Sequence, residues 1–210
     1  MDKVEKVFKF YEMAVRLKQV IRTGWKYWAV EKDRLESVAE HVYGTIMLAV
    51  AIYGNFGDKL NIDIEKVALM LALHETEEIL IGDLTFYDQK YDNKKEAGRD
   101  AVNEIFKNCT TKEPFIDLIK EFEERQTENA KFAYMCDKME AVLQAYLYRE
   151  NFNTEKIEDR IIQHKKIKDM QKKGLDRPEQ FFLEDTRKLY EEDEVFSQIA
   201  CYLEGLEKNK

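Results

Sequence analysis

A histidine and three glutamates directly follow an apolar run in the middle of the chain. Residues 67–73 have the composition of a buried helix, and His74, Glu75 and Glu78 come where that helix should still be buried. Burying imidazole and carboxylate groups is unfavourable unless they find partners. His74 and Glu78 are four residues apart and share one helix face, and Glu75 lies about 100° round the helix from His74. The pattern indicates a site where these groups meet.

The end of this segment leaves a second interpretation open. Gly82 can end the helix, and Asp83 then lies at its C-terminal end. An acidic helix end on a solvated surface explains Glu75, Glu77 and Glu78 equally well from this stretch alone.

Two further residues of the same chemistry lie on other expected helices. Ser37 followed by Glu40 forms a capping-box pattern, which predicts a helix from Ser37 to about Tyr53 with His41 in its first turns. A carboxylate, Asp137, lies among apolar residues in the middle of a helix expected over 127–148. Taken singly, His41 fits a structural histidine, and Asp137 with Lys138 fits an ordinary exposed pair.

The rest of the chain supplies the helices that must position these residues. Apolar residues recur at helical spacing, only 2 prolines and 8 glycines interrupt it, and no strand series is evident, so the expected class is all-α. Asn93 with Glu96 suggests a second capping box, and Lys94, Lys95 and Arg99 are expected on a solvated face. The expected helices cover 3–20, 37–53, 64–81, 93–107, 115–124, 127–148, 156–173 and a segment restarting at 177, with loops at 22–28 and 86–92.

The C-terminal quarter differs in composition. Residues 156–173 are highly charged and are expected to form a solvated helix, in which His164 does no chemistry. An apolar stripe after Pro178 is expected to pack on the core or to form an oligomer contact. We therefore expect a metal-site domain over 1–150 and a helical extension over 151–210 packed on it.

Composition excludes several classes of protein. The net charge of −8 argues against a general nucleic-acid-binding surface, although a local basic pocket is compatible with it. The 3 cysteines show no CxxC spacing, so neither a disulfide framework nor a cysteine zinc site is expected. No signal peptide and no transmembrane run is evident, which favours a cytoplasmic protein without a membrane partner.

Together, His41, His74, Glu75 and Asp137 form a mixed nitrogen and oxygen ligand set from three expected helices. Such a set suits one divalent ion of the Mn²⁺, Fe²⁺, Co²⁺, Ni²⁺ or Zn²⁺ type, with waters completing the coordination. An ion with open positions lowers the pKa of a bound water and polarises a phosphoryl oxygen. Glu78, one helical turn after His74, is then placed for proton transfer.

In this order and spacing, five short motifs resemble the HD-domain phosphohydrolases, and in particular the 5′-deoxynucleotidases that cleave deoxynucleoside 5′-monophosphates. The resemblance spans residues 22–148, roughly two-thirds of the chain. The motifs are Arg22-Thr23-Gly24-Trp25, Glu36-Ser37-Val38-Ala39-Glu40-His41, His74-Glu75-Thr76-Glu77-Glu78, Gly82-Asp83-Leu84 and Asp137-Lys138-Met139-Glu140-Ala141.

The resemblance implies an HD-domain helical bundle with added C-terminal helices, a nucleotide substrate, a divalent metal (Mg²⁺ included) and a homodimer. It assigns His41, His74, Glu75 and Asp137 as metal ligands. By the same comparison, Glu78 matches the catalytic glutamate and Asp83 matches an acidic residue that closes the pocket and positions substrate or water. Arg22 matches a phosphate-binding arginine, and Trp25 matches a residue that lines the nucleoside pocket.

One residue departs from the family pattern. The family has aspartate after its second histidine, whereas this chain has Glu75. The extra methylene moves the carboxylate by about 1.5 Å, which matters when metal–oxygen bonds are about 2.0–2.2 Å long. Two hypotheses follow: an active metal-dependent 5′-nucleotidase or related nucleotide phosphohydrolase, or a degenerate HD domain that binds nucleotide as a regulatory protein.

Overall fold

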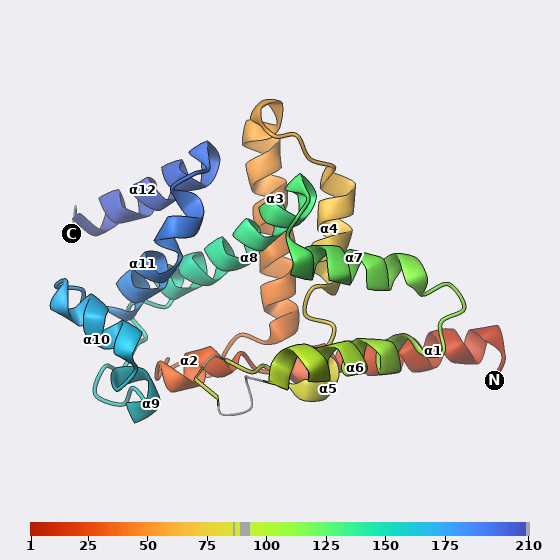
Figure 1. Ribbon diagram of the computed structural model, residues 1–210. Coiled ribbons are helices and arrows are strands. Elements are labelled where there is room, and N and C mark those ends of the chain that lie inside the picture. Colours follow the sequence, from red (N-terminus) through yellow and green to blue (C-terminus); the bar gives the residue numbers. More distant parts are fainter. Residues whose placement is uncertain (86, 89–92, 209–210) are drawn as a thin grey trace.

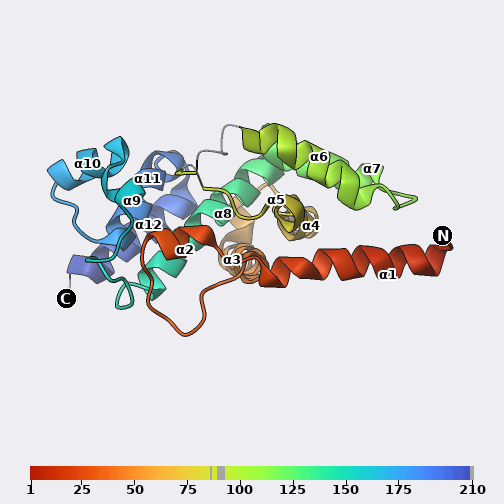
Figure 2. The same cartoon turned by 90° about the horizontal axis from the view of Figure 1, so that it is seen from below.

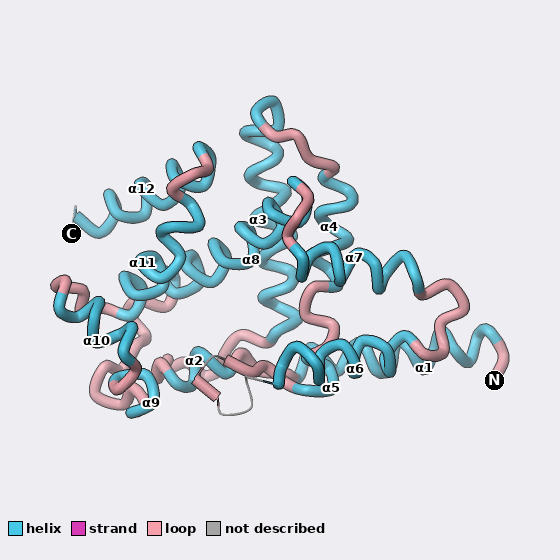
Figure 3. The backbone as a smooth tube through the Cα atoms, in the orientation of Figure 1, coloured by secondary structure: helices cyan, strands magenta, loops and turns pink. Residues whose placement is uncertain are grey.

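Helices make up the fold in the computed structural model, which describes residues 1–85, 87–88 and 93–208. Figure 3 draws helices joined by loops, and the described residues contain no β-strand beyond isolated bridges at Ile21–Ser37 and Val30–Phe152. The α-helices are α1 (Lys3–Ala14), α2 (Thr23–Tyr27), α3 (Val38–Phe56), α4 (Ile64–Leu73), α5 (Glu78–Ile81), α6 (Lys94–Phe106), α7 (Glu113–Glu124), α8 (Glu128–Leu147), α9 (Asp159–Ile162), α10 (Lys165–Lys172), α11 (Pro178–Tyr190) and α12 (Glu194–Lys208). Short 3-10 helices follow α1 (η1, Val15–Gln19) and α3 (η2, Gly57–Lys59).

The core lies where α3, α4 and α8 pack on one another (Figure 1). Their fully buried residues include Ala49 of α3, Met70 of α4 and Met139 of α8. A second apolar cluster joins α6 and α7, and Phe10 of α1 packs against it. None of the helices in the described part of the chain is long and apolar enough to cross a membrane.

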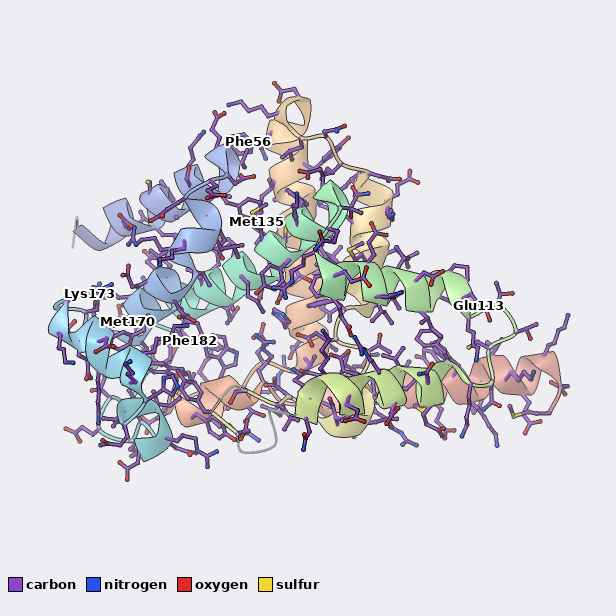
Figure 4. The ribbon with its side chains drawn as sticks, in the orientation of Figure 1. Phe56, Glu113, Met135, Met170, Lys173 and Phe182 are labelled. Carbon is purple, nitrogen blue, oxygen red and sulfur yellow. The ribbon has the colours of Figure 1, made fainter. Side chains whose placement is uncertain are left out.

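The C-terminal helices join the same core. Tyr190 of α11 and Phe196 of α12 are buried with the residues of α3, α4 and α8, and the Phe196 ring contacts Phe132 of α8. Phe182, labelled in Figure 4, packs against three of the apolar clusters. Of the two expectations for the C-terminal stripe, packing on the core is the one that the structure confirms.

Local sequence signals predicted most helix starts correctly. Ser37 and Glu40 form the expected capping box at α3, and the side chains of Asp63 and Thr127 cap α4 and α8. The capping box expected at Asn93 is wrong, because the Asn93 side chain makes no capping hydrogen bond to α6.

The expectation of one continuous helix over 64–81 is wrong. The helix α4 ends at Leu73, a turn follows, and α5 begins at Glu78. Side chains in the turn take the carbonyl groups that the next helical turn would use: the Thr76 hydroxyl donates to Leu73 O (2.7 Å) and His74 Nδ1 to Leu71 O (2.7 Å). Such bonds compete with helix propagation. His74 and Glu78 therefore do not share one helix face.

Three other boundaries differ from expectation. The expected loop 22–28 contains the short helix α2, and the charged segment 156–173 is divided into α9 and α10 with His164 between them. The first helix becomes a 3-10 helix after Ala14. Most of the loop expected over 86–92 lies outside the described residues.

The burial of Phe196 generates a stability prediction. Removing its fully buried ring by Phe196→Ala leaves a cavity against Tyr190 and Phe132, and we expect a loss of about 3–5 kcal/mol in the free energy of unfolding. Urea unfolding followed by circular dichroism measures this. The control is Tyr202→Ala on the same helix, whose side chain is exposed and whose effect should stay below about 0.5 kcal/mol. A negligible effect of Phe196→Ala would contradict a shared core for α12 and α8.

Candidate metal centre

Four potential ligand residues meet where α3, the turn after α4, and α8 approach one another. One ligand atom from each of His41, His74, Glu75 and Asp137 lies within 4.8 Å of the others. Both histidines and Asp137 are buried, and the Glu75 side chain is 13% exposed. The structure thus brings together the four residues that the sequence singled out, although it places His74 and Glu75 in a turn and not inside a helix.

His74 presents an unpartnered nitrogen to this cluster. Its Nδ1–H donates to Leu71 O, which leaves Nε2 as the lone-pair nitrogen. The Nε2 atom is buried and has no hydrogen-bond partner within the described structure. It lies 3.7 Å from Glu75 Oε1 and 3.8 Å from Asp137 Oδ1. A buried acceptor facing two carboxylates fits a cation, because a cation would satisfy all three groups.

His41 is held between two carboxylates on α8. Its Nδ1 lies 2.5 Å from Glu140 Oε2, and its Nε2 lies 3.1 Å from Asp137 Oδ1. Burial and the Arg22 charge disfavour protonation, but the bonds to Asp137 and Glu140 outweigh them and raise the pKa of His41 to about 9. Metal binding requires the neutral imidazole ring. A cation bound at His41 Nε2 would therefore take the place of the proton shared with Asp137.

Glu140 reaches His41 because α3 has a glycine opposite it. A Cβ added at Gly44 would lie 2.5 Å from Glu140 Oε1. Sequence reasoning did not single out Glu140, although it lies three residues after Asp137 and so shares its helix face. A carboxylate that accepts from the second ring nitrogen fixes the orientation of a ligand histidine.

Asp137 is not the exposed residue that the simplest interpretation of the sequence allowed. Lys138 does pair with it, at 2.7 Å between Nζ and Oδ2, but Asp137 is only 4% exposed. Burial raises the pKa of this carboxyl, yet the Lys138 charge and the hydrogen bond from His41 hold it well below its usual range. Asp137 is therefore a buried, ionised carboxylate.

Glu78 lies at the start of α5 with 1% of its surface exposed. Its Oε1 accepts from Lys94 Nζ at 2.8 Å, and its buried Oε2 has no hydrogen-bond partner among the described groups. Burial and the Glu75 charge raise the pKa of Glu78 well above its ordinary value, while Lys94 opposes the shift. Lys94 was expected on a solvated face, and that expectation is wrong because its side chain turns inward to this carboxylate.

The segment around Arg22 lies beside the cluster. Arg22 Nη1 is 3.8 Å from Glu75 Oε1, and the Arg22 side chain is 17% exposed. The next residue, Thr23, donates its backbone N–H to Asp83 Oδ2 (2.5 Å) and its hydroxyl to Asp83 O (2.9 Å). Asp83 therefore fixes the start of α2 and, through it, the backbone that carries Arg22.

Trp25 is buried in the core and does not present an exposed surface to a nucleoside. It is 2% exposed and contacts the rings of Tyr148 and Phe182. Its Nε1–H donates to Glu36 Oε2 at 2.7 Å. Burial and the Glu140 charge raise the pKa of Glu36 to about 7. Trp25 thus supports the acidic residues behind His41.

Similarity to known proteins agrees with this geometry. Residues 14–177 match the family model described as HD domain. The 5′-deoxynucleotidase HDDC2 of Mus musculus is 30% identical over 149 residues, which cover 69% of this chain and 70% of the relative. The 5′-deoxynucleotidase hdd1 of Schizosaccharomyces pombe is 28% identical over 189 residues, which cover 84% of this chain and 92% of the relative.

Solved structures share the fold. A conserved hypothetical protein from Pyrococcus furiosus superposes with a TM-score of 0.68 at 24% identity, covering 94% of this chain and 98% of that protein. A protein from Magnetospirillum magnetotacticum, described as a predicted metal-dependent phosphohydrolase, gives 0.60 at 24% identity over 71% of this chain and 76% of its own. The family match covers well over half of the sequence, and the all-helical architecture agrees with it, so this chain belongs to the HD domain family.

Proposed function

We propose that this protein is a divalent-metal-dependent phosphohydrolase that cleaves nucleoside 5′-monophosphates, including deoxynucleotides, to nucleoside and phosphate. The observation that carries the proposal is the cluster of His41, His74, Glu75 and Asp137 around the unpartnered Nε2 of His74. The similarity to proteins named 5′-deoxynucleotidases supports the choice of substrate.

In this proposal the four clustered residues hold one divalent cation. A cation bound there would polarise a phosphoryl oxygen and make a water more acidic. The protein would hold the two ligand imidazoles in fixed orientations. Leu71 O fixes the tautomer of His74, and Glu140 orients His41. A site built with such supporting hydrogen bonds holds its ligand atoms in place.

Three further side chains have roles in the reaction. Arg22 binds the phosphate, because a guanidinium matches phosphate oxygens and stabilises negative charge during attack on phosphorus. Glu78 transfers a proton with its unpartnered Oε2, either from the attacking water or to the leaving 5′-oxygen. Asp83 holds the Arg22 segment in position through Thr23. Trp25 is left out of the substrate-binding set, because its rings are packed in the core.

Glu75 is the basis of a second candidate function. Its Oε1 lies 3.8 Å from the Arg22 guanidinium, so the longer side chain has an alternative partner to a cation. If Glu75 stays with Arg22, the chain is a nucleotide-binding HD domain without turnover. The 4.8 Å clustering of Glu75 with the other three residues favours the enzyme.

We also propose that the protein forms a homodimer, through α1. Val4, Val7, Phe8 and Tyr11 lie on one helix face, and each is more than 60% exposed. Phe10 of the same helix packs against α6 from a different side of α1, and Figure 2 shows α1 along one edge of the molecule. A contiguous apolar helix face of this kind is typical of a protein–protein contact. A second copy of the chain would cover it.

The proposed ligands predict which variants lose the metal. We expect His74→Ala and Asp137→Ala to lower bound Mn²⁺ or Co²⁺ from stoichiometric to background, as measured by elemental analysis after dialysis. His164→Ala is the control, because the third histidine lies outside the cluster and should leave the metal content unchanged. Full metal content in both site variants would refute the ligand assignment.

The proposed reaction predicts phosphate release from a panel of ribo- and deoxynucleoside monophosphates with Mn²⁺, Co²⁺, Ni²⁺, Zn²⁺ or Mg²⁺. Glu78→Gln should keep the metal and lower kcat by about 100- to 10,000-fold, whereas the exposed Glu65→Gln should have no effect.

The same panel decides between the two candidate functions. A wild type that binds nucleotide but releases no phosphate, with activity appearing in Glu75→Asp, would favour the binding domain. Turnover confined to nucleoside triphosphates would favour a phosphohydrolase of another nucleotide.

The proposed dimer predicts a change in sedimentation velocity. Phe8→Lys places a charge in the centre of the α1 face, and we expect it to convert a dimer to a monomer at micromolar concentration. Tyr202→Lys is the matched control, because Tyr202 on α12 is as exposed as Phe8, at 68% against 67%. Dissociation by Tyr202→Lys alone would move the contact to α12, and a monomeric wild type would exclude the dimer.

A further inference from the structure

Lys94 is a partly buried cation to which the proposed reaction assigns no role. It is the first residue of α6, and its side chain is 24% exposed. Its Nζ donates to Glu78 Oε1 at 2.8 Å and to Leu84 O at 3.3 Å. One side chain therefore connects α6 to the proposed proton-transfer residue and to the backbone next to Asp83.

The position is unfavourable for a lysine on local grounds. The first turn of a helix carries partial positive charge, so a cation there loses stability that an anion would gain. Partial burial of the ammonium adds a desolvation penalty. The recorded compensation comes from outside α6: the Glu78 carboxylate and the Leu84 carbonyl accept from the ammonium, and the charges of Glu75 and Glu77 add to it. The neighbouring Lys95 shows the ordinary alternative, because it is exposed to solvent.

The contact determines how Glu78 presents its two oxygens. Lys94 occupies Oε1, while the buried Oε2 makes no hydrogen bond to any described group. A carboxylate held at one oxygen has a fixed plane, and its second oxygen is available to a proton. Without Lys94, the carboxylate would lose this anchor and would lie buried beside the negative charges of Glu75 and Asp83.

We infer that Lys94 is a positioning residue of the active site, which holds Glu78 Oε1 so that Oε2 exchanges the proton of the reaction. The inference rests on the proposed phosphohydrolase function. Through Leu84 O, the same ammonium also fixes the segment that carries Asp83. The hydrogen bonds of Lys94 go to Glu78 and Leu84, so Lys94 acts through Glu78, while its charge also stabilises the nearby Glu75 carboxylate.

The first test compares Lys94→Met with Lys95→Met under saturating nucleoside monophosphate and metal. We expect Lys94→Met to lower kcat by about 10- to 100-fold with little change in KM or in metal content. Lys95→Met should match the wild type. Lys94→Arg keeps the charge, and we expect it to recover part of the lost kcat. Lys94→Gln replaces Lys94→Met if the methionine variant does not fold, as judged by circular dichroism.

A double-mutant cycle separates positioning from general stability. In the Glu78→Gln background, Lys94→Met should cause no further loss of kcat, because the residue through which it acts is already disabled. An equal loss in both backgrounds would overturn the inference, as would a Lys94→Met kcat equal to that of the wild type. A wild type inactive on every phosphate ester would instead overturn the proposed function, and this inference with it.

Discussion

The burial of charge between α3, α4 and α8 is the constraint on which the rest of the structure depends. His41, Asp137 and Glu140 lie inside an apolar core, and their charges are stable there only because each has a partner. The geometry of those partners is demanding. Gly44 leaves room for Glu140, and the end of α4 turns His74 toward Asp137. The packing of α3, α4 and α8 and the geometry of the site therefore depend on each other.

A second ring of interactions holds the groups that face substrate in the proposed reaction. Asp83 binds the start of α2 beside Arg22, and Lys94 binds Glu78 from the start of α6. Both contacts join segments that follow the α4–α5 turn to other parts of the fold. The acidic groups near Glu75 are numerous, so the two cations Arg22 and Lys94 compensate a negative field as well as orient side chains. The site therefore contains both acidic and basic side chains close together.

The C-terminal helices contribute by completing the core that supports the site. Phe196 and Tyr190 pack against the core residues of α8, the helix that also carries Asp137 and Glu140, and Phe182 packs near Trp25. Trp25 in turn donates to Glu36, next to the Glu140–His41 pair. The tryptophan that resembled a substrate-pocket residue is thus part of a path of contacts between the C-terminal helices and the acidic residues behind His41.

The sequence alone determined the helical class, the cap at Ser37 and the four clustered residues, because caps and residue types are local signals. Only the tertiary structure decided how those residues meet. The break of the 64–81 helix after Leu73 is itself local, because side-chain hydrogen bonds to Leu71 and Leu73 replace helix propagation, but the packing decides that the turn faces α3 and α8. It also turned Lys94 inward and placed Glu140 on His41. Those contacts join residues 16 and 99 positions apart, and the free energy that selects them comes from burial, which no local pattern encodes.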